Sequence, residues 1–124
     1  MTVDTARATR PEDLSRLLVE RLNAADVDGL VALYEPDAVL ALADGRIVRG
    51  SAELREAFAQ FVAGRPTFKP GRPSPALRSG ELALTSSRLP DGTVTAEVAR
   101  LQSDGTWLWV IDQASLVSHP SLSI

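Results

Sequence analysis

The sequence has no cysteine and only one histidine, His119, among its 124 residues. The absence of cysteine excludes disulfide bonds, thiolate metal ligands and cysteine nucleophiles. A serine–histidine–aspartate triad would depend on His119, which lies next to Pro120 near the end of the chain. A zinc site would lack the usual pair of histidines. We therefore expect no metal site, no organic cofactor and a histidine that is solvated or loosely packed.

An excess of basic residues and long apolar runs are also missing. Sixteen acidic residues against thirteen basic ones give a net charge of −3, whereas nucleic acids and acidic membrane surfaces select a basic surface. No segment approaches the roughly 20 apolar residues that span a bilayer, and the first ten residues lack the apolar region of a secretory signal. We expect a cytoplasmic protein with no nucleic acid or membrane partner.

The first half of the chain predicts three helices. Thr9 and Glu12 have the spacing of a capping box before a leucine stripe of helical period. Asp26 is suited to cap a short second helix that continues through Tyr34, and Ser51 is suited to cap a third. Because the chain is short enough for a single domain, these helices are expected to pack on one sheet.

Three Asp-Gly pairs, at 44–45, 91–92 and 104–105, separate apolar runs in the rest of the chain. Asp-Gly between such runs favours a two-residue hairpin turn. The expected strands are 38–43, 46–49, 81–88, 93–102 and 107–117. Helices followed by antiparallel strands indicate an α+β fold in which the helices cover one sheet face.

Residues 65–75 interrupt this pattern with four prolines and three basic residues. Proline and positive charge are typical of an extended loop or a protected edge strand, because both prevent pairing with another edge. An anion-binding arm is the alternative. The basic residues are not interleaved with aromatic ones, as they are in proteins that bind single-stranded nucleic acid, and we therefore favour the loop or edge strand.

Two-residue turns would determine which side chains meet in the final strands. The expected pairs are Leu101 with Leu108, Ala99 with Val110, Glu97 with Asp112, Leu84 with Ala99, and Ser86 with Glu97. The helices would cover this face, so Glu97 and Asp112 would meet inside the protein. Two carboxylates in one desolvated site raise the pKa of one of them, which can then act as a general acid. The alternative is a cluster at an open end of the sheet that is solvated or paired with Arg88.

We therefore predict Glu97 and Asp112 as catalytic residues in an apolar pocket. Ser86 and Arg88 would support them as polar groups. The predicted pocket-lining residues are Leu18, Tyr34, Leu42, Phe58, Phe61, Ser86, Arg88, Ala99 and Val110. For the aromatic residues, a purely structural place in the core is the alternative.

The opposite sheet face would carry Trp107, Trp109 and Ile111 without a helix to cover them. Exposed apolar patches of this kind mark interfaces, and a symmetric homodimer through this face is the simplest arrangement. Arg100 would lie across one of the tryptophans. The alternative is that the tryptophans belong to the core.

Several segments resemble the SnoaL-like and ketosteroid isomerase-like group of the nuclear transport factor 2-like superfamily. They are residues 22–34, 36–40, 45–55, 79–85 and 104–115. The resemblance implies a cone-shaped α+β fold, with a curved, mostly antiparallel sheet wrapped around three N-terminal helices. It also implies an apolar pocket at the open end and dimers through the outer face. We expect a tail at 1–10, one domain at 11–118 and a second tail at 119–124.

The same resemblance carries over only part of the ketosteroid isomerase chemistry. Those enzymes use an aspartate base on the first strand, a tyrosine on the first helix and a protonated aspartic acid on the sheet. The matching positions hold Leu42, Leu18 and Glu97, so steroid isomerisation by that route is not expected. Asp112 would supply the missing base. We expect a small, largely apolar ligand and proton transfer of isomerase, hydratase or cyclase type, with a non-catalytic binding or dimerisation module as the alternative.

Overall fold

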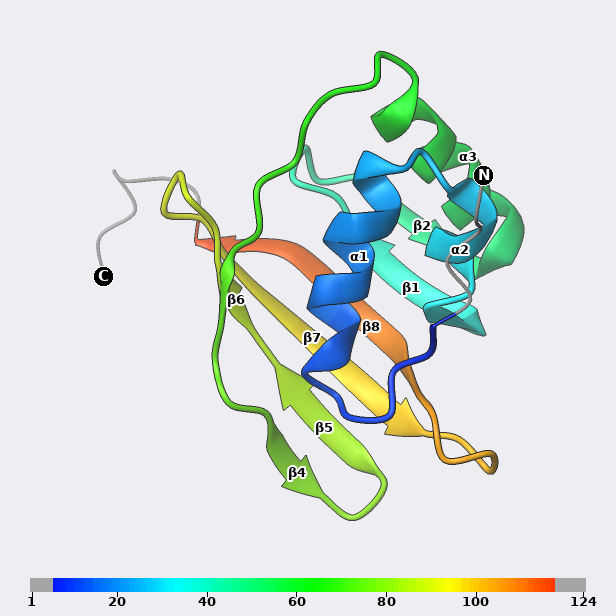
Figure 1. Cartoon of the computed structure of the whole chain (residues 1–124), viewed down its shortest axis with the longest axis vertical. Coiled ribbons are helices and arrows are strands. Elements are labelled where there is room, and N and C mark those ends of the chain that lie inside the picture. Colours follow the sequence, from blue (N-terminus) through cyan, green and yellow to red (C-terminus); the bar gives the residue numbers. More distant parts are fainter. Residues whose placement is uncertain (1–5, 118–124) are drawn as a thin grey trace.

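A computed structural model describes residues 6–117 and shows three helices packed against one curved sheet (Figure 1). The helices are α1 (Asp13–Asn23), α2 (Val27–Val31) and α3 (Gly50–Val62). The strands are β1 (Tyr34–Ala41), β2 (Ile47–Arg49), β3 (Arg72–Pro73), β4 (Leu77–Ser79), β5 (Leu82–Thr85), β6 (Ser87–Arg88), β7 (Val94–Leu101) and β8 (Trp107–Val117). Within these residues no helix is long and apolar enough to cross a membrane. His119 lies outside the described residues.

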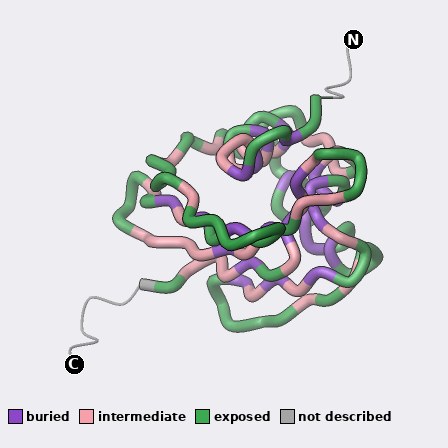
Figure 2. The backbone as a smooth tube through the Cα atoms, turned by 90° about the horizontal axis from the view of Figure 1, so that it is seen from below, coloured by how far each residue is buried: buried purple, intermediate pink, exposed green. Residues whose placement is uncertain are grey.

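The sheet follows the order β2-β1-β8-β7-β5-β4, and β6 joins β7 to the short strand β3. The pairing of β1 with β8 is parallel, and every other pairing is antiparallel. Figure 1 shows α1 crossing the sheet, with α2 and α3 beside it. Buried positions gather in the interior and exposed ones along the peripheral loops (Figure 2). The predicted α+β class with a curved, mostly antiparallel sheet is confirmed.

The helix caps only partly follow the prediction. Asp26 caps α2 as expected, since its Oδ1 accepts a hydrogen bond of 2.9 Å from the backbone N–H of Gly29. The capping box at Thr9 is wrong. The helix begins later, and the Asp13 carboxylate instead accepts from the backbone N–H groups of Thr9 and Arg10, at 3.2 and 3.1 Å. A turn that contains Pro11 precedes the first helical residue.

Two further boundaries differ. Tyr34 is the first residue of β1 and not the end of the second helix, because its segment pairs with β8. The helix α3 has no side-chain cap at its start. Glu53 in its first turn accepts a hydrogen bond of 2.8 Å from the backbone N–H of Arg49, so Ser51 does not have the predicted role.

All three Asp-Gly turns are three-residue loops and not two-residue turns. At the last one, Gln102 N–H donates to Thr106 O at 2.7 Å, and Gly105 N–H donates back to Gln102 O at 3.0 Å. Only the glycine has a positive φ, of 86°, so a type I′ turn is not formed. The carboxylate of Asp104 accepts from the N–H of Thr106 at 2.9 Å. The loops at 43–45 and 90–92 have the same hydrogen bonds.

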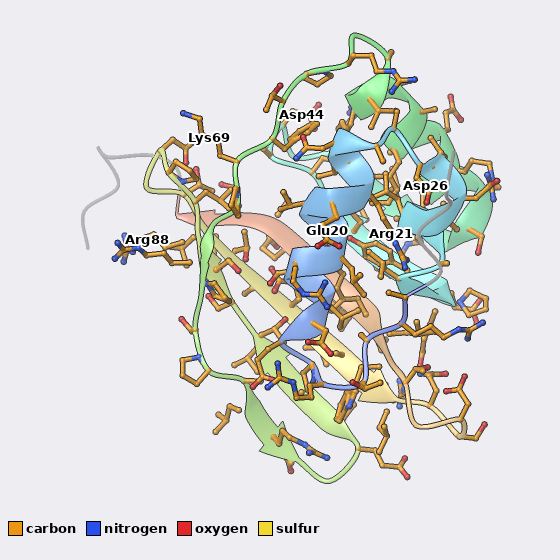
Figure 3. The ribbon with its side chains drawn as sticks, viewed as in Figure 1. Glu20, Arg21, Asp26, Asp44, Lys69 and Arg88 are labelled. Atoms are coloured by element: carbon orange, nitrogen blue, oxygen red, sulfur yellow. The ribbon has the colours of Figure 1, made fainter. Side chains whose placement is uncertain are left out.

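The extra loop residue at 90–92 shifts β5 by one position against β7. Thr85, not Ser86, pairs with Glu97, and Ala83 pairs with Ala99. A shift of one residue moves every side chain of a strand to the other face. The inward residues are therefore Ala83, Thr85 and Ser87, all buried. The predicted inward positions of Leu84, Ser86 and Arg88 are wrong, and the side chain of Arg88 projects away from the sheet (Figure 3).

In the β7–β8 hairpin a β-bulge restores the register that the three-residue loop at 103–105 has shifted. The three-residue loop pairs Leu101 with Trp107 and Ala99 with Trp109, not with Leu108 and Val110 as predicted. The register then shifts at Val110, which leaves Ile111 opposite Val98. Glu97 therefore pairs with Asp112, as predicted. This β-bulge turns Trp109 and Asp112 to the same side of the sheet, which strict alternation would not do.

The tryptophans are consequently core residues, and their predicted place on the outer face is wrong. Trp107 and Trp109 are 2% and 1% exposed, whereas Ile111 is 51% exposed. The side chain over Trp107 is that of Arg78, at 4.8 Å from the ring centre, while Arg100 pairs with Glu35. The homodimer stays a prediction. The outer face carries a row of cross-strand apolar neighbours, Leu77, Leu84, Val98, Ile111 and Val39.

The segment before α1 and the segment 65–75 after α3 also contact the sheet. Ala8, in the predicted tail, is 2% exposed and accepts a hydrogen bond of 2.9 Å from the backbone N–H of Trp107. Within 65–75, Arg72 and Pro73 form the short strand β3 against β6. The proline-rich segment is therefore an extended loop that ends in an edge strand.

Candidate functional site

A cavity of about 840 Å³ lies between α1, α3, the loop 68–71 and the inner sheet face. Of the residues predicted to line a pocket, five lie on its wall: Leu18, Tyr34, Leu42, Phe58 and Phe61. Ser86 and Arg88 do not, because the shift of β5 turns them outward and brings Ser87 to the wall. Ala99 and Val110 also lie off the cavity wall, and Trp109 is there instead.

Glu97 and Asp112 lie side by side on the cavity wall, although they are only 6% and 7% exposed. Burial penalises their charged forms and raises the pKa of both carboxyls. The neighbouring charge of Glu97 raises the pKa of Asp112 further, to about 7. The pair therefore holds a proton well above the pH at which an exposed carboxyl would lose it.

Tyr34 contacts this pair directly. Its hydroxyl donates a hydrogen bond of 2.5 Å to Oδ2 of Asp112. Burial and the charges of Asp112 and Glu97 raise the pKa of Tyr34 well above 10, so the phenol keeps its proton at physiological pH. The rings of Phe58 and Trp109 lie 5.7 and 5.4 Å from the Tyr34 ring centre and hold it in place. Sequence reasoning placed Tyr34 in a helix, because the parallel pairing of β1 with β8 has no local signal.

Thr85 connects the aromatic core to the other carboxyl. The indole Nε1–H of Trp109 donates to Oγ1 of Thr85 at 3.2 Å, and Oγ1 of Thr85 donates to Oε1 of Glu97 at 2.7 Å. All three residues are buried. Sequence reasoning missed this contact, since the predicted register placed Ser86 opposite Glu97. Thr85 and Ser86 are consecutive and both carry a hydroxyl, so the residue types alone could not indicate which of them faces Glu97.

Within residues 6–117, basic side chains are absent from the immediate surroundings of the pair. Those on the cavity lining are Arg10, Arg16 and Lys69. The arginines form ion pairs with acidic residues at 3.3 and 3.4 Å, and Lys69 is exposed in the loop (Figure 3). The charge of the two carboxyls is therefore stabilised by hydroxyl donors and removed only by protonation. In the same part of the chain, no three acidic or histidine side chains are grouped as a metal site would require.

The positions that match the ketosteroid isomerase base and tyrosine also lie on this cavity. Leu42 and Leu18 supply apolar wall there, and the third position holds Glu97. The polar groups of the site come from other strands, namely Tyr34 at the start of β1 and Asp112 on β8. The site thus has two carboxyls and a phenol, in an arrangement different from the one implied by the resemblance.

The family model of the SnoaL-like domain matches residues 15–119. This chain belongs to the SnoaL-like domain family. The match confirms the predicted resemblance and covers most of the SnoaL-like chain. No curated protein matches its sequence.

Solved structures share the fold of this SnoaL-like chain at low sequence identity. A Thiobacillus denitrificans protein proposed to be a calcium/calmodulin-dependent protein kinase type II association domain has a TM-score of 0.74 at 14% identity, covering 91% of this chain and 99% of its own. A ketosteroid isomerase-like protein from Erwinia carotovora atroseptica has 0.66 at 18%, covering 86% and 94%. A proposed NTF2-like dehydratase from Streptomyces avermitilis has 0.65 at 13%, covering 86% and 94%. These similarities establish the fold alone.

Proposed function

We propose that the cavity binds a small, largely apolar molecule, and that Glu97 and Asp112 transfer a proton to or from it. The observation that carries this proposal is the pair of buried carboxyls on an apolar cavity wall, one of them hydrogen-bonded to Tyr34. Reactions of isomerase, hydratase or cyclase type all include such a step. The names of the isomerase-like and dehydratase relatives are consistent with this class of chemistry.

The roles follow from the protonation of the pair. With the pKa of Asp112 near 7, this carboxyl is protonated in about half of the molecules at neutral pH, and in those molecules the pair holds a proton that it can donate. One member can accept a proton from a C–H or O–H group of the ligand, while the other donates to a developing oxyanion. The Tyr34 phenol, which stays protonated, fixes the orientation of Asp112. Positioned acid–base groups of this kind typically accelerate proton transfer by about 10²–10⁴-fold.

A non-catalytic binding module is the second candidate function. Leu18 and Leu42 favour it, because they supply only apolar contact at positions where the resemblance to ketosteroid isomerases implies polar groups. In this case the carboxyls would form hydrogen bonds to a bound molecule without changing it. Both candidates require ligand binding in the same cavity, so one experiment can separate them.

The experiment measures hydrogen–deuterium exchange next to a carbonyl group. The purified protein is incubated in D₂O with a panel of neutral cyclic ketones, and NMR follows the loss of the α-proton signals. Binding of each ketone is measured by tryptophan fluorescence, since Trp109 lies on the cavity wall. We expect exchange faster than in buffer for the ketones that bind. In Glu97→Gln the exchange rate should fall at least about 100-fold while binding is retained.

The matched control is Glu56→Gln, which makes the same chemical change at an exposed position of α3. Its exchange rate and its affinity for the ketones should equal those of the wild type. Binding without exchange would contradict proton transfer and favour the binding module. A panel in which no ketone binds, or exchange that survives in both Glu97→Gln and Asp112→Asn, would contradict the proposed site.

A further inference from the structure

The hydrogen bonds that end at Glu97 have a fixed direction. An indole N–H can only donate, so Thr85 Oγ1 must be the acceptor in its 3.2 Å contact with Trp109. The Thr85 hydroxyl has a single hydrogen, and among the described residues Glu97 Oε1, at 2.7 Å, is the one acceptor within its reach. Thr85 is 8% exposed, and a buried hydroxyl without an acceptor is costly. The hydroxyl therefore donates to Glu97.

Thr95 acts on Glu97 in the same sense. Its Oγ1 accepts a hydrogen bond of 3.0 Å from the backbone N–H of Ser87, which also can only donate. The hydrogen of Thr95 is thus directed elsewhere. Burial raises the pKa of Glu97, and the hydroxyls of Thr95 and Thr85 both oppose that rise. Each threonine hydroxyl accepts a hydrogen bond from an N–H group that can only donate, so its own hydrogen must go to another acceptor.

Asp112 is held differently. One hydroxyl, that of Tyr34, reaches its Oδ2, and among the described residues none donates to Oδ1. A proton on Oδ1 leaves this hydrogen bond intact, because Tyr34 still donates to Oδ2. The Tyr34 hydrogen bond lowers the pKa of Asp112, but burial and the repulsion between the two carboxylates raise it by more. The surroundings of Asp112 therefore accept the neutral acid more readily than those of Glu97.

We propose that Thr85, supported by Thr95, is a positioning residue that keeps Glu97 as the ionised member of the pair and leaves the shared proton on Asp112. This inference rests on the proposed function and assigns its roles. Glu97 accepts the proton of the substrate at its second oxygen, Oε2. Asp112 donates its proton, or a hydrogen bond, to the oxygen on which charge develops. Each turnover returns the pair to its initial state when Glu97 passes the proton it has taken to another atom of the product, and the hydroxyl formed on the substrate oxygen gives its proton back to Asp112 as the carbonyl reforms.

The other charged groups do not disturb this assignment. Asp112 of the neighbouring strand β8 pairs with Glu97, and Tyr34 of β1, beyond β8, is hydrogen-bonded to Asp112. The helix α3 adds only Phe58 and Phe61 to the wall, and the charged residue of the loop 68–71 is the exposed Lys69. The charged lining residues of α1 and the segment before it are Arg10, Glu12, Asp13, Arg16 and Glu20. All except Glu12 pair with one another, and Glu12 accepts from the backbone N–H of Ala76 at 3.5 Å.

The test is a carboxyl titration of the ligand-free protein by ¹³C NMR, with Glu and Asp side chains labelled. In the wild type, the apparent midpoint at Glu97 should lie below that at Asp112. Thr85→Val keeps the shape of the side chain but removes the donor, so the Glu97 midpoint should rise by about one pH unit, a tenfold change in proton affinity. The Asp112 midpoint should fall as the proton moves to Glu97. Thr85→Ser restores a hydroxyl and should restore the wild-type values.

An unchanged Glu97 midpoint in a folded Thr85→Val protein would overturn the inference, as would a wild type in which Glu97 titrates above Asp112. If Thr85→Val does not fold, because Trp109 loses its acceptor, Thr95→Val replaces it and the same rise is expected. The titration needs no substrate. If the titration gives the expected midpoints but no ketone exchanges its α-protons, only the proposed function is overturned. If ketones exchange but the Glu97 midpoint does not change in Thr85→Val, only this assignment is overturned.

Discussion

Asp112→Asn should make the protein more stable at pH 7 and flatten the dependence of its stability on pH. In the folded wild type the pKa of Asp112 is raised from 3.8 to about 7. Below pH 3.8 both the folded and the unfolded state carry the proton, and burial of this side chain has no ionisation penalty. Between 3.8 and 7 the unfolded state loses the proton first, so the free energy of unfolding falls as the pH rises.

Above pH 7 the free energy of unfolding of Asp112→Asn should exceed that of the wild type by about 4 kcal/mol, since each unit of pKa shift corresponds to about 1.4 kcal/mol. Asparagine stays neutral and can still accept the hydrogen bond of Tyr34. Urea unfolding of both proteins at pH values from 4 to 8 measures the difference. The exposed carboxylates with lowered pKa, Asp44, Asp91 and Asp104, are common to both proteins and cancel.

The matched control is Asp37→Asn, which changes an exposed residue of β1. Its stability difference from the wild type should stay small and constant across the pH range. Parallel curves for wild type and Asp112→Asn would show that Asp112 ionises normally in the folded protein. That result would remove the basis for a shared proton in the cavity.

Trp109→Ala should destabilise the fold by about 3–5 kcal/mol, the range found when large core aromatic residues are truncated. The Trp109 ring is 1% exposed, packs against Tyr34 and donates to Thr85. Ile111→Ala, two residues away on the same strand, should cost less than about 1 kcal/mol, because Ile111 is 51% exposed on the outer face.

Chemical denaturation of the two variants tests the β-bulge at Val110 directly. Without the bulge, Trp109 and Ile111 would lie on the same face of the sheet. Truncating either residue would then lower the stability by a similar amount. Losses of similar size in the two variants, or a larger loss for Ile111→Ala, would contradict the register. The bulge matters for function because it places the Trp109 indole and the Asp112 carboxyl on one side of the sheet.

The fold class could be predicted because its signals are local. Leucines at helical spacing, Asp26 as a cap and glycines after aspartates mark the ends of elements through short-range chemistry. The register was harder, since an Asp-Gly pair fits both a two-residue turn and a three-residue loop with glycine in the left-handed region. One residue of difference reversed the faces of β5, and Ser86 and Arg88 were placed on the wrong side.

The pairing of Glu97 with Asp112 was predicted correctly through two errors that cancel. The three-residue loop shifts the pairing of β7 and β8 by one residue from the predicted register. The extra residue at Val110 on β8 shifts it back by one, so the predicted register holds from Ile111 to Asp112. The run from Trp107 to Ile111 is apolar at every position, so no alternation of polar and apolar residues could reveal the bulge. The contact of Tyr34 with Asp112 joins residues 78 positions apart through a parallel pairing, for which the local sequence offers no signal.

The most direct test of the central claim is the titration of the Asp112 carboxyl carbon in the ligand-free wild-type protein. If this side chain meets Glu97 and Tyr34 at the wall of an apolar cavity, its apparent midpoint should lie near pH 7. Midpoints near pH 4 for both Asp112 and Glu97 would mean that water solvates the two carboxyls as it would on an open surface, and the proposed chemistry would be contradicted.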